Sequence, residues 1–198
     1  MNVAAAFERF VRQPHTYALT GSTNTGVAVT ATLTIAQGLS TSSRGRAYDV
    51  TSVTMQLRNS SGAVVGSGTA SPWFLAGTVD QAFVATSDGT CAVTSSGTKL
   101  PTSASVGQNG PYVTATEYAG CSTLDNVRGP ISSGTRTQTW SVNSIEGGTY
   151  ACLHTSRVDF FTTTESDCVQ VVDARGNLGG GVRVTLKDAN GVTTTLSN

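Results

Sequence analysis

Hydrophobic and polar residues alternate over most of this chain, and a period of two is typical of β-strands with one buried face. In the clearest run, residues 27–35 (VAVTATLTI), the side chains of Val27, Val29, Leu33 and Ile35 share one face. The Thr-rich, acidic segment 162–167 is expected to be a turn. Further strands are expected at residues 17–19, 50–65 (a hairpin), 79–86, 90–94, 112–118, 140–145, 149–161 and 168–172.

One helix is predicted, at residues 4–12 (AAAFERFVR). Phe7, Phe10 and Val11 have the i, i+3, i+4 spacing that places them on one face of a helix. Two helical turns are marginal in water, so this segment needs an apolar surface to dock on. We therefore expect Phe7, Phe10 and Val11 to make contacts, either with the rest of the chain or with a neighbouring subunit.

Two segments share one hairpin pattern, VTMQLRNSSGAVV from residue 53 and VRVTLKDANGVTT from residue 182. In the second, Val182, Val184 and Leu186 form an apolar face. Only seven residues follow its glycine, Gly191, and an isolated hairpin is marginally stable. This hairpin is expected to pair with an earlier part of the chain or with another subunit.

The stretch 139–152, TWSVNSIEGGTYAC, combines a strand, a glycine turn and a second strand in which Tyr150 and Cys152 share a face. This order resembles the E–F corner of immunoglobulin-like β-sandwiches, such as those of bacterial surface and phage structural proteins. The resemblance implies that Trp140 lies in the core. It also implies that the hydroxyl of Tyr150 bonds back to the backbone.

The expected fold is therefore all-β, an antiparallel β-sandwich that is Ig-like or Greek-key, with a short N-terminal helical arm. The arm would span residues 1–16 and the β-sandwich domain residues 17–198. The glycine-rich bend at 173–181 marks a sub-boundary within that domain.

Four cysteines stand at positions 91, 121, 152 and 168, and none forms a C-x-x-C pair. No histidine lies beside them at metal-ligand spacing, so zinc binding is not indicated. An even number of cysteines in a Ser/Thr/Gly-rich β chain favours disulfides, and Cys91–Cys121 with Cys152–Cys168 closes the shortest loops. Buried free thiols are the alternative.

The composition argues against several classes of partner. Charged residues make up 12% of the chain, about half the usual share, while Ser and Thr number 54. Twelve basic and twelve acidic residues cancel, so no net field attracts nucleic acid. No run approaches the ~20 apolar residues of a membrane-spanning helix, and no membrane insertion is expected. No targeting signal is recognised at residues 1–9, and an extracellular or virion location is expected.

Candidate catalytic residues are few. His15 and His154 are expected to be ordinary histidines, because no nucleophile elbow accompanies them. Paired carboxylates could come from Glu165 and Asp167, or from Asp167 and Asp173. Glu165, placed in the expected turn, is interpreted as a solvated residue or a weak calcium ligand.

These observations lead to a non-enzymatic function with no cofactor and no metal. The leading hypothesis is a structural subunit of a repetitive extracellular or virion assembly, such as a filament, tail or capsid. Its homo-oligomeric or polymeric contacts would come from the apolar arm and the terminal hairpin described above. The alternative is an adhesion module that binds a glycan or protein receptor through the loops at 95–110 and 122–134, with Trp73 as a stacking residue. A secreted hydrolase is the third hypothesis.

Overall fold

The computed structural model describes residues 1–127, 132–159 and 162–198. Its elements, in chain order, are α1 (Val3–Arg12), β1 (His15–Thr23), β2 (Ala28–Gln37), β3 (Thr41–Ser43), β4 (Arg46–Asn59), β5 (Val64–Leu75), β6 (Gln81–Thr86), β7 (Thr90–Gly97), β8 (Asn109–Ala119), the 3-10 helix η1 (Leu124–Asn126), β9 (Gly134–Ile145), β10 (Gly148–Val158), β11 (Thr162–Val171), β12 (Leu178–Lys187) and β13 (Thr193–Ser197).

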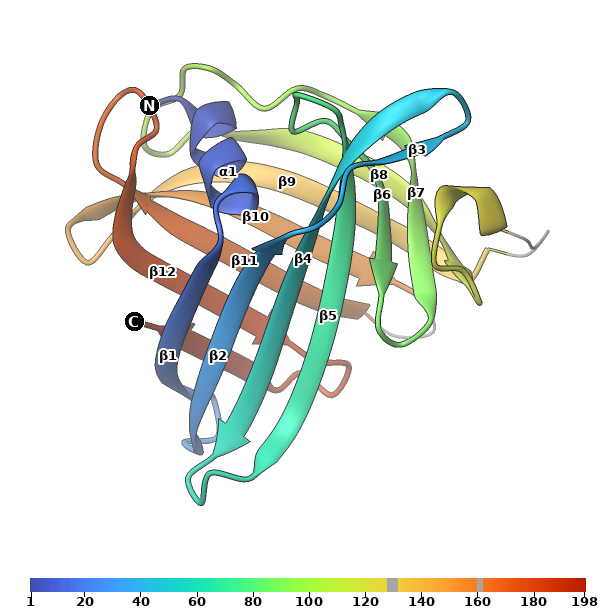
Figure 1. Ribbon diagram of the computed structural model, residues 1–198. Coiled ribbons are helices and arrows are strands. Elements are labelled where there is room, and N and C mark those ends of the chain that lie inside the picture. The colour runs from blue at the N-terminus through green and yellow to red at the C-terminus, as the bar shows by residue number, and fades with distance from the viewer. Residues whose placement is uncertain (128–131, 160–161) are drawn as a thin grey trace.

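The strands form a closed antiparallel barrel (Figure 1). Within the described residues, twelve strands make the ring, and β3 is an additional strand that pairs with β4. Each strand of the ring pairs with its neighbour in sequence, apart from two contacts that close it: β2 pairs with β4, and β1 pairs with β13. The expected β-sandwich is therefore wrong, because one continuous sheet curls round until its two ends meet.

The seam between β1 and β13 depends on a close approach of two backbones. Gly21 lies opposite Leu196, and a Cβ atom at Gly21 would stand 1.8 Å from the carbonyl oxygen of Thr195. Only glycine fits at such a distance. The terminal hairpin β12–β13 consequently pairs within its own chain, and Val182 and Val184 are buried in the barrel's core with Leu186 packed against them.

The predicted immunoglobulin-like corner is also wrong. β9 and β10 are adjacent strands of one hairpin, with Ile145 opposite Gly148. The two turn residues, Glu146 and Gly147, both have positive φ (51° and 80°), which is the geometry of a tight type I′ hairpin turn. The hydroxyl of Tyr150 makes no hydrogen bond to the backbone among the described residues, and it lies against Gly181. Trp140 is half-buried and packs against the core, over Gly110.

The helix α1 closes one end of the barrel. It lies between β1–β2 and β9–β11 in Figure 1, near the end marked N. Its apolar face, with Phe7, Phe10 and Val11, is buried against strands of the same chain. The backbone at residues 1–4 is tied to the 98–108 loop, since Val3 and Ala4 donate to the carbonyl of Pro101. The arm therefore has the apolar surface that its length requires.

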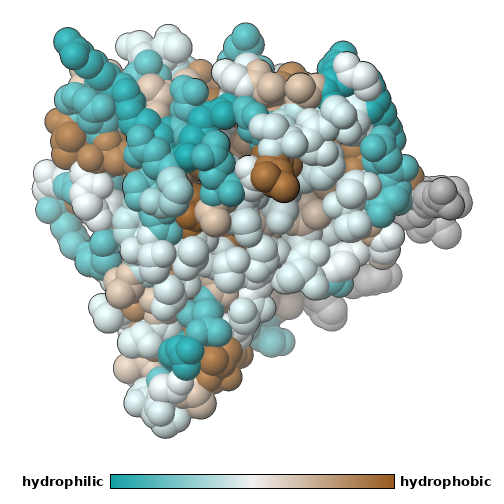
Figure 2. All heavy atoms as spheres, in the orientation of Figure 1, coloured by the Kyte–Doolittle hydropathy of each residue, from teal (hydrophilic) through white to brown (hydrophobic). Residues whose placement is uncertain are grey.

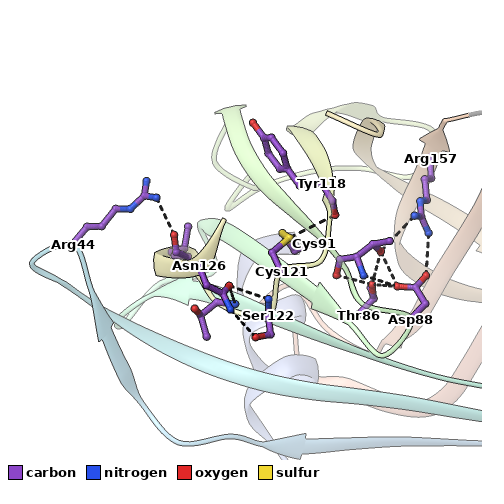
Figure 3. Close-up of a disulfide and its surroundings, with 12 residues drawn as sticks. Arg44, Thr86, Asp88, Cys91, Tyr118, Cys121, Ser122, Asn126 and Arg157 are labelled. Carbon is purple, nitrogen blue, oxygen red and sulfur yellow. Dashed lines mark hydrogen bonds and ion pairs between the residues drawn. A yellow bond between two sulfur atoms is a disulfide. The ribbon is translucent and has the colours of Figure 1, made fainter. Parts of the chain in front are cut away.

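A second, smaller core lies between the outer surface of the barrel wall and the segments that cover it. It contains Trp73, Tyr48, Phe83 and Leu124, and the disulfide Cys91–Cys121 joins the wall to the segment that leads into η1 (Figure 3). Trp73 is only 8% exposed, so it is not available to stack on a ligand. The Arg44 side chain donates to the carbonyl of Leu124 and attaches η1 to the β3–β4 hairpin.

The surface seen in Figure 2 is mostly polar, and the apolar residues on it are scattered. One small apolar patch lies near the tip of the β4–β5 hairpin, where Val64 and Val65 are exposed. Among the described residues, no helix is long and apolar enough to cross a membrane.

Candidate functional site

The barrel encloses a cavity of about 120 Å³ beneath α1. One side of the cavity is apolar, formed by side chains of α1 and of the strands around it. The other side is polar and comes mainly from β8 to β11. The lining includes the apolar residues Phe7, Phe10, Leu33, Phe74, Leu100 and Leu153, and the polar residues Gln81, Tyr112, Arg136, Gln138, Thr155, Glu165 and Asp167.

The strand period places the polar residues in the lumen. Glu165 and Asp167 are two residues apart on β11, so both side chains lie on the inner face, as does Val169. The expectation that 162–167 is a solvated turn is wrong. The threonines there are β-branched residues of a strand, and β11 pairs from Thr162 onward with β10. Asp173, by contrast, lies in the bend before β12, where its carboxylate accepts hydrogen bonds from Asn177 and Arg175.

Two arginines of the lumen share one carboxylate. Glu117 on β8 is fully buried, and its two oxygens accept from the Nε atoms of Arg136 (3.0 Å) and Arg157 (2.6 Å). Arg157 also lies 3.5 Å from Asp88 and 3.7 Å from Asp159. Arg136 has Glu117 as its ion-pair partner within the described residues. The positive charge of the lumen is thus already compensated.

Glu165 and Asp167 are differently placed. Neither forms a direct ion pair or hydrogen bond with the residues that the structure describes, and the accessible part of each lines the cavity. Burial raises the pKa of Glu165, although the positive charge of Arg136 works in the other direction. Burial raises the pKa of Asp167 well above its usual range, and the neighbouring Glu165 adds to this increase. The pair therefore holds a proton readily at the polar end of the cavity.

Two buried amides bordering the same cavity each have one atom without a hydrogen-bond partner among the described residues. Gln81 is 8% exposed and Gln138 is 9% exposed. The Nε2 atom of Gln81 and the Oε1 atom of Gln138 have no hydrogen-bond partner in the described parts of the chain, while Nε2 of Gln138 donates to Thr155. Exchanging the two ends of the Gln138 amide would leave its nitrogen without an acceptor instead. Since an unpaired buried polar atom is costly, these two positions are prepared for hydrogen bonds from outside the chain.

Other hollows lie next to the cavity, toward the end of the barrel away from α1. These two hollows, of about 310 and 400 Å³, share Ala70 and Glu165 with the cavity. At this end, which we call the mouth, Asp88 accepts hydrogen bonds from Thr86 and Thr90 and faces Arg157 (Figure 3). Burial alone would raise the pKa of Asp88, but these hydrogen bonds and the Arg157 charge lower it to about 2. Asp88 is therefore ionised at neutral pH, beside the guanidinium of Arg157.

A separate polar cluster lies on the outer face of the barrel. The Nε2 atom of His154 is 2.7 Å from the Ser141 hydroxyl, and its Nδ1 atom is 2.8 Å from that of Ser166. The disulfide Cys152–Cys168 joins β10 to β11 beside it. Burial lowers the pKa of His154. The strand backbone around His154 is paired in the ladder of β9, β10 and β11.

The other predicted site residues are distributed over the fold. His15 stacks on Tyr17 at a ring distance of 5.5 Å, on the same face of β1 as the core residue Leu19, and it is not among the residues that line the cavity. The cysteines pair as expected from adjacency, Cys91 with Cys121 and Cys152 with Cys168. The loop at 95–110 is hydrogen-bonded to the start of α1, through the carbonyl of Pro101. Within the loop at 122–134, the segment around Arg128-Gly129-Pro130 lies outside the described residues.

Sequence reasoning missed Glu117, Arg136, Gln138 and Thr155. A signal for three of them was present. Arg136 and Gln138 lie on the same face of β9 as Trp140 and Val142, and Glu117 lies on the same face of β8 as Ala115. Each of these polar residues therefore continues a face that is otherwise apolar. Charged residues on a buried face are rare without a partner or a function.

No group of three or more histidine, cysteine or acidic residues suited to a metal ion occurs within the ranges that the structure describes. Comparison of the chain with protein-family models, with curated proteins and with solved structures finds no significant match.

Proposed function

We propose that this protein binds a compact small molecule inside its barrel. The observation that carries the proposal is the set of unsatisfied polar groups around an otherwise apolar cavity. One atom of each of two buried amides, and two carboxyl groups, face it without a direct partner in the described chain. Ligand sites typically combine an apolar lining with a few polar groups of this kind.

The dimensions suit a small ligand. A cavity of roughly 150 Å³ accepts one aromatic ring. This cavity measures about 120 Å³, so a ligand with an aromatic ring would extend from it into an adjoining hollow. We take the adjoining hollows, which share Ala70 and Glu165 with the cavity, as the route from solvent. A ligand of six to ten heavy atoms would place its apolar part against Phe10 and Leu153 and its polar part toward β11.

The assembly hypothesis stays a prediction, but two of its three supports are now explained otherwise. Phe7, Phe10 and Val11 fill the barrel, and the β12–β13 hairpin completes the ring. The near-neutral, Ser/Thr-rich surface is what remains in its favour. The two disulfides indicate an oxidising compartment, which suits an extracellular binding protein as well as a virion component.

The proposal is tested by blocking the route. Ala70 borders all three hollows, so Ala70→Leu would place three additional carbons at their junction. Ala63→Leu, in the exposed β4–β5 turn, is the matched control. Wild type and Ala63→Leu are titrated with benzylamine, benzyl alcohol and benzoate by ligand-observed NMR. At least one probe is expected to bind both proteins and to lose affinity at least about tenfold in Ala70→Leu. Absence of binding, or equal binding by Ala70→Leu, would refute it.

A further inference from the structure

We propose that the ligand is a small organic amine, and that its ammonium group lies between Glu165 and Asp167. This inference rests on the proposed function, since it concerns the polar end of the same cavity. It names the chemical class of ligand that the charges and open hydrogen-bonding positions of the lumen accept.

The charge balance of the lumen favours a cationic ligand. The titratable groups that face the pair come from each neighbouring element, and both arginines among them are bound to Glu117. Glu165 and Asp167 are left as two acids with no cation in contact among the described residues. Lys187, at the mouth, is exposed and forms no ion pair in the lumen with the residues that the structure describes. The titratable groups that surround Glu165 and Asp167 are Glu117 and Tyr112 on β8, Arg136 on β9, Arg157 on β10, Asp88 before β7, and Lys187 and Asp188 at the end of β12.

The hydrogen-bond acceptors at the polar end of the cavity also suit an ammonium group. An ammonium group donates three hydrogen bonds and accepts none. The polar end of the cavity offers two carboxylates and the unpartnered Oε1 atom of Gln138 as acceptors. Hydrogen bonds that join two charged groups are roughly twice as strong as neutral ones. The apolar side chains opposite, among them Phe10 and Leu153, would cover the ligand's hydrocarbon part.

In the ligand-free protein, burial favours the protonated forms of Glu165 and Asp167. Glu165 also repels Asp167 when both are ionised, and this repulsion raises the pKa of Asp167 further. A bound ammonium ion compensates both charges and favours their ionised forms. Binding should therefore release protons, and affinity should rise with pH while the amine stays protonated.

The experiment compares benzylamine with benzyl alcohol and benzoate, which share one ring and differ in the polar group. Calorimetric titration of wild type at about pH 6 and about pH 8, in two buffers of different ionisation enthalpy, gives affinity and proton release. We expect benzylamine to bind at least about tenfold more tightly than benzyl alcohol. Its affinity should increase at the higher pH, and protons should be released.

Variants identify the groups. Asp167→Asn and Glu165→Gln should each lower benzylamine affinity at least about tenfold and leave that of benzyl alcohol unchanged. Glu146→Gln, an exposed carboxylate outside the barrel's lumen, should change neither. Circular dichroism checks that each variant is folded.

The outcomes are distinguishable. Benzyl alcohol binding as tightly as benzylamine would overturn the amine inference and leave the proposed function standing. Benzoate binding most tightly would overturn it in favour of an anion held by Arg136. If none of the three probes binds wild type, both the inference and the proposed function fail.

Discussion

Replacing Glu117 by glutamine tests whether the lumen's ion pairs are as strongly coupled as their geometry indicates. The side chain is fully buried, and Glu117→Gln keeps its size while removing the charge that Arg136 and Arg157 share. Breaking a buried pair from one side costs about 3–5 kcal/mol, because the other charge stays buried without compensation.

The two arginines contribute unequally. The Arg157 side chain is 24% exposed and keeps Asp88 and Asp159 nearby, so its share should be that of a surface pair, about 0–1 kcal/mol. The Arg136 side chain is 11% exposed and loses its ion-pair partner. We therefore expect a total of about 3–4 kcal/mol, which corresponds to a fall in Tm of about 6–16 °C for a domain of this size.

Urea denaturation followed by tryptophan fluorescence measures this loss in unfolding free energy. Glu146→Gln makes the same chemical change on the exposed pair with Arg183, and it should cost less than about 0.5 kcal/mol. Adding Arg136→Met to Glu117→Gln removes the uncompensated charge, so the double variant should be more stable than the single one. A loss below about 1 kcal/mol for Glu117→Gln, or a double variant that is less stable still, would refute the reasoning.

Two further predictions concern stability. The raised pKa of Asp167 means that the folded state binds more protons than the unfolded state, so this group lowers stability as pH rises from about 4 toward its folded pKa. Asp167→Asn should therefore leave Tm nearly unchanged at low pH and raise it near neutral pH, and a difference independent of pH would contradict this. Gly21→Ala should cost at least about 1–3 kcal/mol, because the new Cβ would meet the Thr195 carbonyl oxygen. Gly68→Ala, where a Cβ meets nothing within 4 Å, is the control in the same denaturation assay.

The sequence predicts the local structure better than the global one. The alternation of Val182, Val184 and Leu186, the helix with Phe7 and Phe10, and the cysteine pairs are local in sequence or follow from loop length. Barrel closure is not local. Alternating strands look the same in a sandwich and in a barrel, and the decisive contact, β1 with β13, joins segments at opposite ends of the barrel's sequence.

The candidate site was predictable only in part. Glu165 and Asp167 were recognised as a pair, but their Thr-rich surroundings favoured a turn because acidic residues are rare in strands. Their inward orientation follows from the register of β11, in which Cys168 and its partner Cys152 face outward. That disulfide, once paired, fixes the phase of the strand and places Asp167 on the opposite face.

The helix that closes one end of the barrel also bears on the order of folding. Phe7 and Phe10 belong to a core that joins α1 to strands from both halves of the chain, so α1 can hold the curved sheet together before the β1–β13 seam forms. The seam is the contact of longest sequence separation, and such contacts form late because their loop-closure entropy is largest. An apolar nucleus of α1 on β2 and β10–β12 is therefore expected to precede closure, with the seam as the slow step.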